Sequence, residues 1–357
     1  EWENKFGVSG HFQENIYQGL PLIPNFRIGS AGIYAIERLI FPTGALEFGL
    51  RADQQAQTSF LGQRDFQAHV RRGSLSETVC TVKSEVAHCP LSYSAISSSI
   101  GGLWQAIPNH VELKLDLSLA NRFPNADELY VLGTAPTFPV FAFGAPNLSK
   151  ERQLGLSPSV GFQSRWITGE LSGFSNWIED YVYFSPELAA DGSLAYEVTI
   201  RGAYPRYNYA PISAWFYGAD GSVTLAPERP VSFQAVVSVV RGRNQDASVF
   251  LVGIPSDRLL LNLNAEKEDW GRAQLSTELV AKQSLVDESL DFAPTPDRYV
   301  LLHASVSKDW MLGGNQGTLS LYGSNLLNQS YRNYMSLLRY YADDKGRDVR
   351  LAFSYRF

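Results

Sequence analysis

The chain has two cysteines, Cys80 and Cys89, which lie close together in a stretch of mostly polar residues. In an oxidising compartment, such a pair closes a short loop as a disulfide. Two free thiols are one alternative, and a metal site is another. His88 adjoins the second cysteine, but no Cys-x-x-Cys pair supports zinc binding. The spacing therefore predicts a Cys80–Cys89 disulfide.

No other group of residues has the types and spacing of a catalytic site. The sequence contains no Gly-x-Ser-x-Gly, no His-Glu-x-x-His and no phosphate-binding loop. Nothing in their spacing forces the five histidines to converge on a metal, although a metal-receptor role stays open: His11, His69, His88, His110 and His303. The formal net charge of −6, without a basic stripe, argues against nucleic-acid binding. We expect no enzyme, no bound metal and no cofactor.

The elements that carry these residues are long strands. Between Val111 and Leu119, every odd-numbered residue is apolar and every even-numbered residue is polar. The same period-2 alternation returns between Val349 and Phe357. Strands of soluble sandwiches usually run about 5–6 residues, whereas a tilted strand needs about 9–11 to cross a membrane. The pattern predicts an all-β fold, a transmembrane antiparallel β-barrel, rather than a soluble sandwich.

Alternation also predicts which side chains meet lipid. In the strand Val111–Leu119, the apolar side chains Leu113, Leu115 and Leu117 should face lipid. The polar side chains Glu112, Lys114 and Asp116 should face the lumen. Carboxylates in such strands are expected to form a solvated lumen wall. The alternative is that they shape the electric field of the lumen for a passing ligand.

The segments number about fourteen across a single barrel unit, residues 1–357. They begin near Trp2, Ala31, Ala45, Tyr93, Val111, Ser149, Trp166, Ile212, Val231, Arg258, Arg272, Arg298, Thr318 and Arg347. Short and long connections alternate between them, as in bacterial barrels with short periplasmic turns and long extracellular loops. We expect periplasmic termini, and both cysteines in a long extracellular loop, Thr58–Leu91.

The C-terminal segment resembles the end of TonB-dependent outer-membrane receptors. It carries Asn325-Leu-Leu-Asn328 followed by Tyr331, then Gly346-Arg347 and an aromatic last residue. Two upstream segments resemble the same family. They are Arg122-Phe-Pro with Glu128-Leu, and Pro146-Asn-Leu with Glu151, where Ala145 replaces the usual Asn.

The resemblance implies a plug domain, a barrel of about twenty-two strands, and energy from TonB acting on the plug. It also implies that the barrel-assembly machinery reads the terminal aromatic residues, here Phe353, Tyr355 and Phe357. With about fourteen strands and no plug-like segment, the chain matches the C-terminal portion of such a receptor. We therefore expect the first and last strands not to pair with each other. Outer-membrane lipid would surround the barrel, but it offers no hydrogen-bond partner to the unpaired backbone groups of these edges. Another polypeptide, either the plug and early strands or another chain, would therefore cover the edges. A passive fourteen-stranded channel, in which Trp2–Tyr17 pairs with Arg347–Phe357, is the alternative.

The resemblance implies uptake of a scarce nutrient, such as a metal chelate, peptide or sugar. A structural or interaction subunit of an outer-membrane complex is a different hypothesis. The candidate ligand contacts are charged and aromatic loop residues: Arg122, Glu128, Tyr130, Phe138, Phe141, Tyr204, Arg206 and Tyr207. Such rings can equally pack on one another to stiffen the mouth. The resemblance also implies that a haem receptor would carry a histidine between the two upstream segments. The matching stretch, Val131–Gly144, contains none, which argues against haem.

Overall fold

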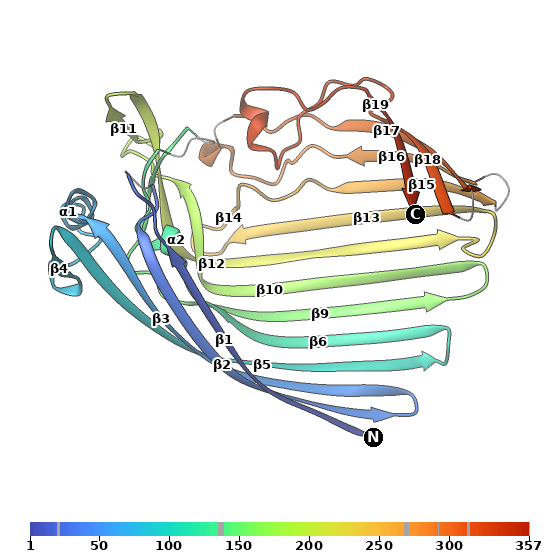
Figure 1. Ribbon diagram of the computed structural model, residues 1–357, viewed down its shortest axis with the longest axis horizontal. Coiled ribbons are helices and arrows are strands. Elements are labelled where there is room, and N and C mark those ends of the chain that lie inside the picture. Colours follow the sequence, from blue (N-terminus) through green and yellow to red (C-terminus); the bar gives the residue numbers. More distant parts are fainter. Residues whose placement is uncertain (20–21, 135–138, 268–270, 292, 313–314, 357) are drawn as a thin grey trace.

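The computed structural model describes residues 1–19, 22–134, 139–267, 271–291, 293–312 and 315–356. Within this part of the chain, one antiparallel wall contains almost all of the secondary structure (Figure 1). Nineteen strands share the sheet, and five short ones lie in the loops. The remaining fourteen match the number that the alternation predicts, so the all-β barrel wall is confirmed.

The wall strands are β1 Trp2–Asn15, β2 Asn25–Phe41, β3 Gly44–Gly62, β5 Val86–Ile107, β6 Val111–Arg122, β9 Glu151–Gln163, β10 Ile167–Pro186, β12 Gly202–Leu225, β13 Val231–Asn244, β15 Arg258–Lys267, β16 Gly271–Val280, β17 Tyr299–Leu312, β18 Asn315–Ser324 and β19 Asp348–Arg356. Each wall strand before β19 pairs antiparallel with the next wall strand along the chain. The loops hold the short strands and helices: β4 Thr81–Lys83, β7 Leu132–Thr134, β8 Phe141–Phe143, β11 Tyr196–Thr199, β14 Val249–Phe250, α1 Gln63–Arg71, α2 Ala126–Tyr130, η1 Glu77–Val79, η2 Glu288–Leu290 and η3 Leu337–Tyr340. No helix in these described ranges is long and apolar enough to span a bilayer.

Short turns gather at one end of the wall and long loops at the other, as expected (Figure 1). Two boundaries differ from the expectation. β5 begins at Val86, so Cys89 lies in a strand and not in a loop, and β12 begins at Gly202 rather than near Ile212. Both strands continue past the alternating region as paired hairpins. Alternation ends there because loops pack on these extensions, burying polar Gln57 and Ser59.

The two outermost strands each have one ladder partner among the described residues. β1 pairs with β2, and β19 pairs with β18. No ladder in the described part of the chain joins β1 to β19, which confirms that expectation. The wall is a curved open sheet with the first and last strands at its margins (Figure 1).

The register separates an apolar face from a polar face. Leu117 stands opposite Ile100, and Leu113 opposite Trp104, while Asp116 stands opposite Gly101 on the other face. Leu115 is 50% exposed although it lies mid-strand, as expected for a side chain that meets lipid. The division between leucines and charged residues in β6 therefore follows the predicted facing.

Exposed aromatic residues mark two levels on the wall. Trp2, Trp104 and Trp166 lie near the short turns, whereas Phe12 and Trp177 lie toward the loops, and all five are exposed. Phe12 follows Trp2 by ten residues on one face of β1. Ten residues extend about 33 Å along a strand, or about 25 Å across a membrane when the strand tilts by 35–45°. The aromatic residues therefore bound an apolar band of bilayer height.

Candidate functional site

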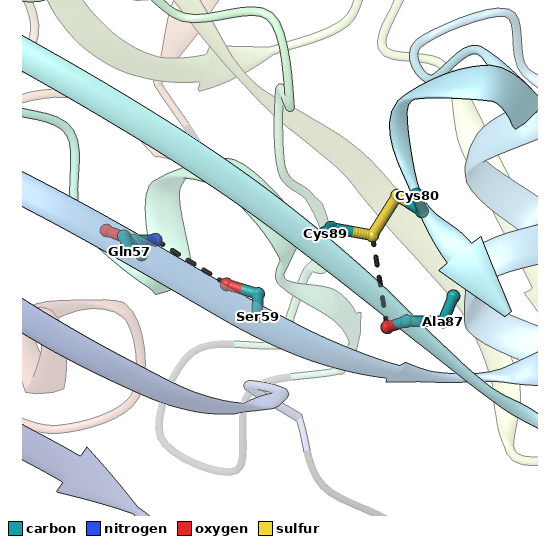
Figure 2. The surroundings of a disulfide bond; sticks show 5 residues. All are labelled: Gln57, Ser59, Cys80, Ala87 and Cys89. Atoms are coloured by element: carbon teal, nitrogen blue, oxygen red, sulfur yellow. Dashed lines mark hydrogen bonds between the residues drawn. A yellow bond between two sulfur atoms is a disulfide. The ribbon is translucent and has the colours of Figure 1, made fainter. Parts of the chain in front are cut away.

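The disulfide loop joins the ends of β3 and β5. Cys80 and Cys89 form the predicted disulfide, and both are nearly or fully buried (Figure 2). Cys89 pairs with Ser59 of β3 in the ladder, so the disulfide anchors η1 and β4 to the wall. Because the loop is fixed at this point, α1 has a defined position above the strands.

A second loop, between β6 and β9, is fixed by charge. Both Arg122 terminal nitrogens donate to carboxylates: Nη1 to Glu128 at 2.9 Å, and Nη2 to Glu151 at 2.5 Å. Glu128 also accepts the backbone N–H of Asn125 at 2.8 Å, completing a capping box at α2. Glu151 accepts the N–H of Val182 in β10. Two predicted ligand contacts, Arg122 and Glu128, thus hold the loop to the wall and bind each other.

The two loops share one buried core. Tyr130 is 2% exposed and packs edge-on against His69 of α1, with ring centroids 6.1 Å apart. The same cluster includes the disulfide, Leu61 and Leu129. Burial lowers the pKa of His69, and it raises the pKa of the Tyr130 hydroxyl. This predicted ligand contact lies within the core of the loop end.

A charged group, which we call the mouth cluster, lies where the disulfide loop meets the start of β12. It comprises Arg72, Phe143, Glu187, Arg206 and Asn208. Arg72 Nη2 donates to Glu187 at 2.7 Å and to Asn208 at 2.8 Å, and Arg206 Nη2 lies 3.0 Å from the same carboxylate. The Arg72 guanidinium carbon stands 3.8 Å from the Phe143 ring centroid, a cation–π contact. Two arginines share one carboxylate, so the cluster carries an excess positive charge.

A short parallel ladder brings three other candidates together. β8 pairs with β12 so that Phe141 stands opposite Arg206, and Ala142 opposite Tyr207. Tyr207 is buried, whereas Phe141 and Arg206 are partly exposed. Tyr204 lies four residues before Asn208, on the β11–β12 hairpin opposite Glu197. Phe138 lies outside the described residues.

The last two long loops are joined by a buried ion pair. Arg339 Nη2 lies 2.7 and 2.6 Å from the two oxygens of Asp291, and their side chains are 4% and 0% exposed. The Arg339 guanidinium also contacts the faces of Tyr334 and Tyr340. Burial raises the pKa of Tyr334 to about 12. This pair connects η3 to the β16–β17 loop.

The proposed assembly residues lie on the apolar face of the last strand. Phe353 stands opposite Leu319, and Tyr355 opposite Gly317. Both aromatic side chains are exposed, by 63% and 38%, and Phe357 lies outside the described residues.

Sequence reasoning missed Arg72, Glu187 and Asn208. Arg72 stands 115 positions from the carboxylate it binds. No periodicity links such distant positions, and only the loop fold unites them. Within the described ranges, no group of three or more His, Cys, Asp or Glu side chains could hold a metal ion.

The family profile described as TonB dependent receptor-like, beta-barrel matches residues 5–326. The chain belongs to this family. Members are receptors and transporters of the bacterial outer membrane, so the wall described above is an outer-membrane barrel wall. The matched range runs from β1 to the loop after β18 and includes the mouth cluster.

Solved structures agree on the fold of this TonB-dependent receptor barrel. The copper transporter OprC has a TM-score of 0.71 and 15% identity over 93% of this chain and 48% of its own. The FrpB iron transporter from Neisseria meningitidis has a TM-score of 0.67 and 14% identity, over 100% of this chain and 53% of its own. The third structure is a double mutant of the Serratia marcescens hemophore receptor HasR in complex with its hemophore HasA and heme. It has a TM-score of 0.68 and 15% identity, over 100% of this chain and 56% of its own. The chain thus spans about half the length of these structures.

Proposed function

We propose that this chain is the barrel wall and ligand-collecting mouth of a receptor for energised uptake of a scarce nutrient. The observation that carries the proposal is the mouth cluster. It combines two arginines, one carboxylate and an aromatic face at the long-loop end, with Arg72 and Arg206 side chains both 26% exposed. Such a group recognises an anionic or planar ligand by charge-assisted hydrogen bonds and stacking. The long loops are then extracellular and both termini periplasmic.

In this mechanism the loops bind the ligand, TonB pulls on a plug, and the ligand passes along the polar face of the wall. The plug and the strands that continue the sheet beyond β1 and β19 belong to the rest of the receptor or to another chain. Support comes from the two edges, each with one ladder partner among described residues. Unpaired backbone groups cost several kcal/mol each in lipid. The mass of the native protein tests this proposal: a mass near that of this chain alone favours a separate partner chain.

A growth and uptake screen would identify the nutrient. A strain that lacks the receptor is supplied in turn with metal chelates, haem, peptides and oligosaccharides, and the one whose uptake it loses is the ligand. The affinity of that ligand is then measured for the receptor and for Arg206→Gln. We expect a loss of about ten- to a hundredfold, since a charge-assisted hydrogen bond contributes about 1.5–3 kcal/mol.

Arg165→Gln is the matched control, because Arg165 lies in the β9–β10 turn at the opposite end of the wall. Equal affinities of all three proteins would refute the assignment of the mouth cluster. If the deletion impairs no uptake but disrupts an outer-membrane complex, the chain is a structural subunit.

A further inference from the structure

The apolar face of the wall contains a groove of about 820 Å³ across β1, β2, β3 and β5. Its floor is made by small side chains, Ala31 and Ala52, with Val8, Ile33 and Ile96 around them. Val8, Ile33, Ala52 and Ile96 form one cross-strand row, so the groove lies on the face that meets lipid. A barrel exterior is convex, and a hollow of this size needs a local cause.

The cause is the parting of β5 from β6. The β5–β6 ladder stops at Ser98, although β5 itself begins at Val86. The carbonyls before that point lose their ladder partners and are capped by side chains instead. Asn121 Nδ2 donates to the Ile96 carbonyl at 2.9 Å, and Lys150 Nζ donates to the Ser94 carbonyl at 2.6 Å. The gap between the strands becomes the loop-side end of the groove.

The groove ends at the level where lipid headgroups lie. On β5, Ser94 is ten residues from Trp104, and on β9, Arg152 is ten residues from Phe162. Both Trp104 and Phe162 are exposed aromatic residues near the short turns. The same ten-residue spacing separates Trp2 from Phe12 across the apolar band. The basic end of the groove therefore lies at the long-loop interface, and its apolar floor lies within the hydrocarbon.

The charge at that end is positive. Lys150 lies within ion-pair distance of no carboxylate in the described part of the chain. Arg152 pairs with Glu179 at 2.6 Å, but these side chains are 61% and 68% exposed, so the pair is weak. Asp53 borders the groove, but its register places its carboxylate on the opposite, polar face, where it pairs with Arg51 at 2.6 Å. A basic rim above an apolar floor matches a molecule with an anionic head and hydrocarbon chains.

We infer that this groove binds a membrane lipid with a phosphate headgroup, in the leaflet on the long-loop side. Lys150 and Arg152 would receive the phosphate, and one acyl chain would lie over Val8, Ile33 and Ile96. The site is separate from the mouth cluster and serves anchoring rather than uptake.

Native mass spectrometry tests the inference on the full protein, purified from outer membranes in a mild detergent. The probes are dioleoyl phosphatidic acid, the diacylglycerol that lacks the phosphate, and inorganic phosphate. We expect phosphatidic acid to bind, and the Lys150→Gln/Arg152→Gln double variant to bind it about thirtyfold more weakly. Each basic side chain near a membrane surface contributes about a factor of five. Diacylglycerol should bind the wild-type protein about as weakly as phosphatidic acid binds the double variant.

Two further variants make the result specific. Lys150→Arg/Arg152→Lys keeps both charges and should retain binding within a few-fold. Lys114→Gln removes a lysine from the polar face of β6 and should change nothing. If the double glutamine variant binds phosphatidic acid as well as the wild-type protein does, the site is wrong. If inorganic phosphate displaces the lipid at equal concentration, the groove recognises an anion and not a lipid.

Discussion

The wall and the loop end of this protein are built on different physical principles. In the wall, each strand contacts its neighbours along the chain, and both of its faces meet a solvent, lipid on one and water on the other. At the loop end, residues far apart in sequence form ion pairs, as Arg72 with Glu187 and the buried Arg339 with Asp291 do. Position along a strand therefore determines a wall residue's role, while a loop residue's role depends on distant partners. Substitutions at the two ends should have different costs for different reasons.

The largest effect is expected at the buried ion pair of the loop end. Asp291→Ala leaves the Arg339 guanidinium buried without its carboxylate, which costs about 3–5 kcal/mol. Amide hydrogen exchange of the β16–β17 and β18–β19 loops would measure the loss of protection. Asp297→Ala is the control, because Asp297 is 93% exposed and forms a 3.6 Å pair with Lys282 in the same loop. Similar losses in both variants would mean that burial does not set the cost.

In the wall, the loss of folding stability caused by a substitution should depend on which face of the strand carries the side chain. Leu115→Arg places a charge on the lipid face near the middle of β6 and should destabilise by about 2–4 kcal/mol. Asp116→Arg introduces the same side chain one position away on the polar face and should cost much less. Refolding titrations into vesicles would compare the two, and equal costs would contradict the assigned facing.

Removal of the disulfide should loosen the loop end while sparing the wall. The bridged residues are nine positions apart, and closing a loop of this length stabilises by about 2–3 kcal/mol in the chain-entropy model. For Cys80→Ala/Cys89→Ala, we expect faster hydrogen exchange in residues 63–85 and unchanged protection in β15 and β16. Loss of protection throughout the wall would show that the two regions do not fold independently.

The smallest expected effect is a pH dependence of the disulfide loop. Burial lowers the pKa of His69 below its ordinary value of 6.5, so the folded loop favours the neutral imidazole. The resulting stabilisation is present above the unfolded-state pKa and is lost as the pH falls through the folded-state value. Hydrogen exchange of α1, corrected for the intrinsic rate, should accelerate on acidification. The same profile in His69→Gln would exclude His69 as the cause, and His110→Gln, at a short turn, serves as the control.

The difference between the two regions also explains what the sequence could predict. Period-2 alternation located the fourteen wall strands and assigned the faces of β6, because each face of a strand has one solvent. It failed at the start of β5, because loop packing there buries the face that is polar elsewhere in the wall, including Ala87 and its neighbour Ser59 of β3. The disulfide followed from the spacing of its cysteines. The pairing of Arg206 with Phe141 could not be predicted, because β8 and β12 are separated by some sixty residues along the chain.

The pairing of each wall strand with its neighbours along the chain has a kinetic consequence. Every wall ladder joins strands separated by one connection, so closing it costs little loop entropy compared with other β-proteins. Hairpins such as β2–β3 and β9–β10 can form first, and the sheet can grow by adding neighbours. The parallel β8–β12 contact spans a much longer stretch and needs β9 and β10 in place beforehand. The wall should therefore assemble by successive pairing of neighbouring strands, and the mouth cluster should form last.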